Sequence, residues 1–321
     1  MNGIATMTTL LRRELWESPI AFKWTPLILG GLCIVLVLMG LAMGAQVDYQ
    51  LAFTYDIVRQ FSEQSLAERR AIITPALYGI VALFNAILFI IIVFYLAGSL
   101  YDDRKDRSIL FWKSLPVSDT STVLSKLLTA MILAPLLFLI GILLTQIGIL
   151  MIASVYALGA GINPFSAFWQ PAGLPMMWLT LAASYLVQAL WLAPVYAWLL
   201  FCSSWAPRLP ILVAIGIPVL AGLGQNFYTM FTGFRFPDFN IWVLTFGRIG
   251  QGVLPVSFNF NTGGQDGQAE FQALDASGVP ISLELSDLWA RLVSINLWIG
   301  VGVAVVLLAG AIWFRRRATD N

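Results

Sequence analysis

The chain holds one dense cluster of charged residues, DDRKDRSILFWK at residues 102–113. It carries seven of the 35 charged residues of the protein. The long runs on either side of it, residues 71–101 and 127–207, carry no charge at all. Ionic side chains concentrated in one short segment favour recognition of a partner surface through charge and hydrogen bonding.

A strongly apolar patch follows the charges directly. If this stretch is helical, Ser108, Phe111, Trp112 and Leu115 share one face, and Pro116 ends or redirects the helix. A loop that only has to stay in water has no use for Phe and Trp beside six charges. Two interpretations remain open: an anchor whose Trp lies at an interface, or a helix that docks on a partner.

Catalytic chemistry has little support in the sequence. Histidine, the commonest general base and metal ligand, is absent. The motifs GxxxxGK[ST], HExxH, GxSxG and CxxC are also absent. The two cysteines, Cys33 and Cys202, lie far apart in apolar runs, where small buried hydrophobes are common. We therefore expect no enzyme activity and no cofactor or metal in this chain.

Three neutral amides interrupt the apolar runs, at Asn85, Gln146 and Gln188. Such groups are costly in lipid unless they are paired, so we expect them to face protein or a cavity. One interpretation is hydrogen bonding between helices, worth about 1 kcal/mol each. The other is that they line a path for a substrate.

The elements that position these residues are membrane spans. The chain is 59% apolar and only 11% charged, whereas soluble domains are about one quarter charged. This composition predicts an all-α polytopic membrane protein. We expect residues 24–321 to form a transmembrane domain of six helices, at about 26–45, 75–99, 123–156, 174–202, 211–227 and 292–314. Asp119, Ser121 and Thr122 can cap the third of them.

The remaining segments follow from this layout. Residues 1–23 are predicted to form an amphipathic interfacial helix, because Met7, Leu11 and Leu15 recur on one face while Glu14 lies elsewhere. Segments 46–74 and 228–291 connect spans on the opposite side, the second with a small hairpin near 267–285.

Lys and Arg residues set the expected orientation. Twelve of them lie on the side that holds both termini and the hairpin 100–122, against six on the other side. The positive-inside rule therefore predicts cytoplasmic termini and a cytoplasmic hairpin. The net charge of +1, without a basic run with interleaved aromatics, gives no support for nucleic-acid binding.

The charged hairpin resembles that of a known family. DDRKDRSILFWKSLPVSD at residues 102–119 is similar to the segment between the second and third spans of ABC-2 type ABC exporter permeases. The preceding LLRRELWESP, residues 10–19, and the six-span layout also resemble that family.

The resemblance implies a permease in the bacterial cytoplasmic membrane that pairs with a second permease copy, as a homodimer or a heterodimer. It also implies a soluble ABC ATPase subunit, encoded separately, that binds ATP and Mg²⁺. The hairpin would then be a coupling helix docked on that ATPase, with Phe111, Trp112 and Leu115 as buried contacts. Its remaining coupling residues would be Asp103, Arg104, Asp106, Arg107, Ser108 and Pro116, the four charged ones setting orientation.

Two other functions are compatible with the residues. A membrane scaffold that transports nothing would use the same hairpin to hold a cytoplasmic partner. A membrane-embedded enzyme is the third, and the lack of histidine and of carboxylates within the spans argues against it.

Overall fold

The structure is a computed structural model, and it describes residues 3–47, 51–106, 117–234, 240–253 and 285–317. Every regular element in these residues is helical. Six helices are long and apolar enough to cross a membrane, which confirms the predicted all-helical class and number of spans. The predicted hairpin near 267–285 lies almost entirely outside the described residues.

The chain begins with α1 (Gly3–Glu17) and a π-helical turn, η1 (Ile20–Trp24), which continues into α2. The other elements of the first half are α2 (Thr25–Val47), α3 (Leu51–Glu63), α4 (Leu66–Lys105), α6 (Asp119–Leu128), η2 (Thr129–Leu133) and α7 (Ala134–Gly159). Those of the second half are η3 (Phe165–Trp169), α8 (Gln170–Ala172), α9 (Leu174–Trp205), α10 (Pro210–Thr232), η4 (Val243–Gly247), α11 (Arg248–Val253), α12 (Leu285–Val293) and α13 (Ile295–Arg317).

The second span begins earlier than predicted, at Leu66 instead of near residue 75. A capping box explains the early start. The Glu68 amide donates to the Ser65 hydroxyl at 3.3 Å, and the Ser65 amide donates to the Glu68 carboxylate at 2.7 Å. These two bonds satisfy amides that a helix start otherwise leaves unpaired. Pro75 is then accommodated inside the helix.

Three of the spans are much longer than a bilayer needs. The continuous helical segments 66–105, 119–159 and 165–205 contain 40, 41 and 41 residues. At about 1.5 Å per residue each extends for roughly 60 Å, twice the roughly 30 Å hydrocarbon core. An average tilt of about 20° cannot absorb this difference, so these helices project beyond the hydrocarbon.

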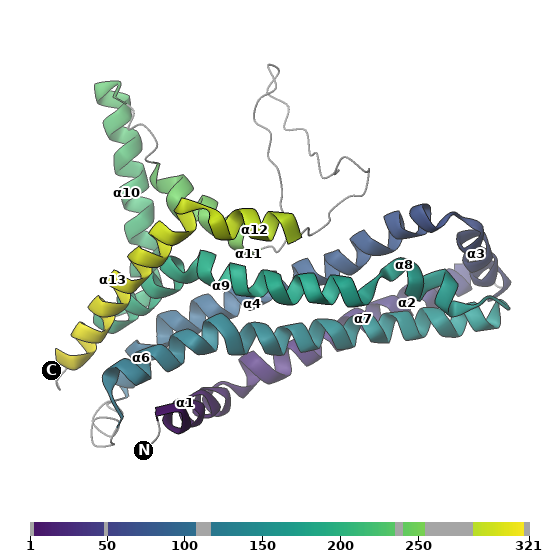
Figure 1. Cartoon of the computed structure of the whole chain (residues 1–321), viewed down its shortest axis with the longest axis horizontal. Coiled ribbons are helices and arrows are strands. Elements are labelled where there is room, and N and C mark those ends of the chain that lie inside the picture. Colours follow the sequence, from purple (N-terminus) through teal and green to yellow (C-terminus); the bar gives the residue numbers. More distant parts are fainter. Residues whose placement is uncertain (1–2, 48–50, 107–116, 235–239, 254–284, 318–321) are drawn as a thin grey trace.

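Helix α9 lies at the centre of the bundle and is the most buried of the six spans. It packs against α4, α10 and α13, while α2 packs on α7. In Figure 1 the long helices α2, α4, α7 and α9 run side by side, and α10 and α13 diverge from them. Helix α1, the start of α6 and the end of α13 lie together at one end of the bundle.

Candidate functional site

The predicted coupling residues fall into two groups. Arg107, Ser108, Phe111, Trp112, Leu115 and Pro116 lie outside the described residues. Asp103, Arg104 and Asp106 are described, at the end of α4. Asp106 is the exposed C-cap residue, and its amide donates to the Asp102 carbonyl at 2.9 Å. The other two side chains contact the rest of the bundle.

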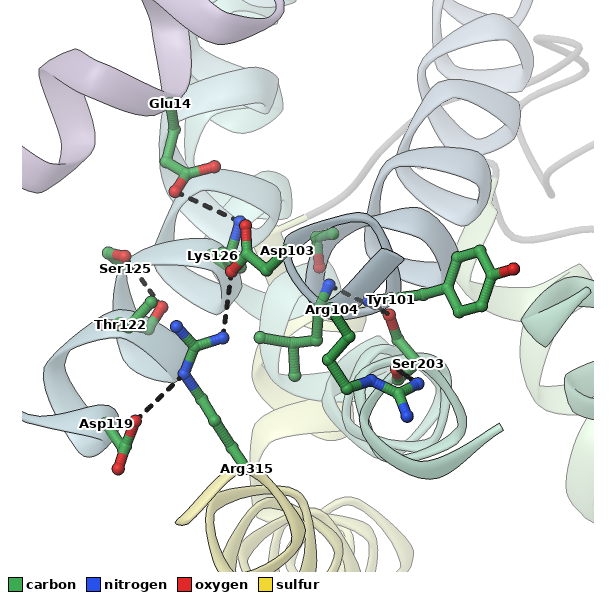
Figure 2. A network of polar contacts seen from close by, with 12 residues as sticks. Glu14, Tyr101, Asp103, Arg104, Asp119, Thr122, Ser125, Lys126, Ser203 and Arg315 are labelled. Carbon is green, nitrogen blue, oxygen red and sulfur yellow. Dashed lines mark hydrogen bonds and ion pairs between the residues drawn. The ribbon is translucent and has the colours of Figure 1, made fainter. Parts of the chain in front are cut away.

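Asp103 is joined to Asp119 through a single arginine from the last turn of α13. Arg315 Nη1 donates to Asp103 Oδ2 at 2.9 Å, and Nε donates to Asp119 Oδ1 at 3.2 Å (Figure 2). Arg315 is only 3% exposed. Asp103 lies in the last turn of α4 and Asp119 begins α6, so the two carboxylates flank residues 107–116 in the chain. Arg315 therefore holds both ends of the predicted coupling segment together.

The expected caps of the third span are corrected by this arrangement. The N-cap of α6 is Ser118, whose hydroxyl accepts from the Ser121 amide at 3.1 Å. Asp119 lies in the first turn, where a carboxylate is favoured by the helix dipole, and its side chain binds Arg315. Thr122 donates its hydroxyl to the Ser118 carbonyl at 3.3 Å.

Arg104 ties the end of α4 to the end of α9. Its Nη2 donates to the carbonyls of Ser203 and Ala206, at 2.9 and 2.8 Å. In return, the Ser203 hydroxyl accepts from the amides of Leu100 and Tyr101, each at 3.0 Å. The last carbonyls of a helix have no partner within it, and an arginine side chain is a suitable donor for them.

A second buried ion pair connects α1 to the same region. Lys126 Nζ lies 3.5 Å from Glu14 Oε1, and the two side chains are 3% and 1% exposed. Tyr95 of α4 donates its hydroxyl to Glu14 Oε2 at 2.6 Å. The sequence pattern places Glu14 away from the apolar face of an interfacial helix, and the structure corrects this, because Glu14 is buried. Its carboxylate instead binds α4 and α6, which places α1 against the bundle.

The neutral amides of the spans have different surroundings. Gln146 of α7 donates to the Leu77 carbonyl at 3.3 Å and accepts from Trp178 Nε1 at 2.8 Å. It thus links α7 to α4 and α9, as expected for a hydrogen bond between helices. Gln188 of α9 donates to the carbonyls of Gly252 and Val253 in α11.

Asn85 and Gln188 share one small cavity, and Gln146 does not line it. The cavity holds about 10 Å³, close to the space of one water molecule. Asn85 donates to the Val81 carbonyl at 2.9 Å. Its Oδ1 is buried without a hydrogen-bond partner among the described residues. The buried Tyr185 hydroxyl also belongs to the lining, and its side chain interacts with that of Asn85.

Six long apolar helices, with ionic residues gathered at their ends, define the coarse class of the molecule. The chain is an integral membrane protein. No family model, curated protein or solved structure matches it. Among the described residues no three His, Cys, Asp or Glu side chains are grouped so that they could hold a metal ion.

The two ion-paired groups form an ionic cluster of Glu14, Asp103, Asp119, Lys126 and Arg315. Both cations of this cluster were missed by sequence reasoning. Arg315 and Lys126 are two of the twelve Lys and Arg residues that the orientation count assigns to the side of the termini, and the sequence pattern assigns no ion pair to either. One signal was available: Lys126 is the only charged residue between Asp119 and Arg208. A lone cation at the start of a long apolar run requires a carboxylate partner when it is buried. The sequence offered no indication that Glu14 is that partner.

Proposed function

We propose that this chain is the permease subunit of an ABC exporter, in which a separate ATPase subunit supplies the energy. The observation that carries the proposal is the ionic link between the two ends of the charged hairpin, at Asp103 and Asp119, which we call the hairpin root. Asp103 and Asp119 flank residues 107–116, and Arg315 binds both. A force applied to that segment would act on α4, α6 and α13 together.

Further contacts extend this link to two more helices, α9 and α1. Arg104 connects the end of α4 to α9, and the Lys126–Glu14 pair connects α6 to α1. Binding of an ATPase at the hairpin could therefore shift five helices as a unit. In this proposal the ATPase binds ATP and Mg²⁺, and a second permease copy completes the transporter.

The polar groups within the spans are compatible with a closed state. The cavity shared by Asn85 and Gln188 holds about 10 Å³, which is too small for any substrate larger than water. If these amides line a substrate path, α4 and α9 must separate during the transport cycle. Gln146 bridges α7 to both helices. Its hydrogen bonds would therefore oppose that separation or determine its direction.

The test is co-purification followed by reconstitution. The tagged chain is extracted in mild detergent together with an ATPase encoded by a neighbouring reading frame. A stoichiometric complex whose ATP turnover depends on this chain supports the exporter. A bound partner without ATPase activity would support the scaffold, and loss of every partner would contradict both.

The docking surface is tested by two substitutions in the hairpin. Trp112→Ala should weaken retention of the ATPase more than Lys105→Ala, because buried aromatic residues dominate interface energies more often than rim charges. Lys105 is exposed at the end of α4, so its substitution serves as the control for loss of a charge alone. The reverse order of retention would refute the proposed docking face.

A further inference from the structure

A large apolar cavity lies between α4, α9, α10 and α13, with η4 and the start of α11 also in its wall. Its volume is about 560 Å³, within the roughly 300–1,000 Å³ typical of small-molecule sites. Its walls are aliphatic and aromatic apart from one threonine and one arginine, and include Pro194, Trp198, Pro218 and Val303.

The divergence of α10 from the bundle leaves this space open. Trp198 Nε1 donates to the Ala214 carbonyl at 2.9 Å and holds the first part of α10 against α9. Pro194 and Pro218 lie inside these two helices, where proline removes a backbone hydrogen bond and bends the helix. Beyond the contact with Trp198, α10 leaves the bundle (Figure 1).

The one charged residue of the cavity wall is Arg248, the first residue of α11. Its Nε donates to the Trp191 carbonyl at 2.7 Å, and its Nη1 donates to the Asn296 carbonyl at 3.2 Å. The guanidinium lies 4.6 Å from the centre of the Trp191 ring. Nη2 is buried and has no acceptor among the described residues.

The charge of Arg248 also lacks a counter-ion in the described part of the chain, since no carboxylate there pairs with it. Burial lowers the pKa of this guanidinium, but arginine remains protonated throughout the physiological range. A cation beside an apolar cavity is therefore complementary to a ligand that has an anionic end and an apolar body.

The direction of the cavity fits such a ligand in a bilayer. Arg248 contacts α13 near its start, at Asn296 and beside Gly300. The cavity residues Val303 and Leu307 lie about one and two turns further along α13. The space thus extends from the cation at one end of a membrane-spanning helix toward the middle of that helix, as an acyl chain extends from its headgroup.

We propose that this cavity binds an acidic phospholipid of the surrounding membrane, with the anionic headgroup at Arg248 and an acyl chain between α9, α10 and α13. The proposal does not depend on the exporter function and applies equally to a scaffold. Detergent-purified full-length chain, stripped of lipid, is titrated with phosphatidylglycerol and with phosphatidylcholine of the same acyl chains. Native mass spectrometry measures the lipid bound.

The charge is tested with Arg248→Gln. Hydrogen bonds to charged groups predict at least about a tenfold loss of phosphatidylglycerol affinity and little change for phosphatidylcholine. Arg69→Gln is the matched control, because Arg69 also donates to a backbone carbonyl, that of Ser166 at 2.7 Å, but lines no part of the cavity. Equal affinity of the unsubstituted chain for the two lipids would overturn the proposal.

The cavity is tested with Val303→Phe, which adds bulk at its wall and keeps Arg248. We expect weaker binding of both lipids. Val306→Phe is the control, since Val306 lies on the same helix, is 71% exposed and does not line the cavity. If Arg248→Gln fails to fold, the comparison of Val303→Phe with Val306→Phe tests the site on its own. Equal phosphatidylglycerol affinity of these two variants would contradict the site.

Discussion

Replacement of Arg315 by alanine is the most direct test of the ionic link at the hairpin root. Arg315 is 3% exposed, and its closest ion pair, to Asp103 at 2.9 Å, involves a carboxylate that is 10% exposed. Removing one partner of a buried pair leaves an uncompensated charge and costs about 3–5 kcal/mol. With an unfolding entropy of about 2.1 cal/mol/K per residue, a chain of 321 residues loses about 1.5 °C per kcal/mol, so the melting temperature should fall by about 4–7 °C.

The assay is thermal unfolding in detergent, followed by tryptophan fluorescence, on a double-mutant cycle. Arg315→Ala and Asp103→Asn are measured alone and together. Because the double substitution removes both charges, its destabilisation should be well below the sum of the single effects. Arg316→Ala is the control, since Arg316 is exposed and, within the described part of the chain, its side chain makes only a 3.5 Å bond to Thr120. Additivity within about 0.5 kcal/mol would refute the link.

Two further pairs of substitutions test other parts of the molecule. Glu14→Gln should destabilise the chain by about 3 kcal/mol or more, because it breaks a buried pair, whereas Glu17→Gln should cost under about 1 kcal/mol, because that side chain is 45% exposed. Equal melting temperatures would contradict the burial of Glu14. Gly300→Ala would place a methyl group against the Arg248 guanidinium, so it should weaken phosphatidylglycerol binding. Gly302→Ala meets no atom within 4 Å and should bind lipid as the unsubstituted chain does; indistinguishable affinities would argue against Arg248 as the headgroup contact.

The spans were predictable because their signal is local. Hydrophobic runs and their length depend on composition, which the bilayer imposes on every spanning helix. The boundaries of the helices were less predictable. Helix α4, for example, begins before its apolar run, because Ser65 caps and stabilises its start. The Arg13–Glu17 pair, spaced four residues apart on one helix, was also within reach of sequence reasoning.

The ionic cluster was not predictable, because its partners are distant in the chain. Arg315 binds residues 212 and 196 positions away, and the Lys126–Glu14 pair joins the fourth turn of α1 to α6. Composition shows that these charges exist near span ends but not which ones meet. The apolar cavity was likewise invisible, since it depends on the angle at which α10 leaves α9. Only packing in three dimensions determines that angle.

Helix α13 connects the two proposed sites. Arg315 near its end binds the hairpin root, and Gly300 near its start lies against Arg248. Fifteen residues of helix separate these positions, or roughly 22 Å. A shift of α13 that follows the hairpin would also move Val303 and Leu307 in the cavity wall. The contacts at the two ends are nevertheless independent, because no described residue belongs to both. Loss of lipid binding in Arg248→Gln therefore leaves the Arg315 link in place, and each proposal stands or fails by its own measurement.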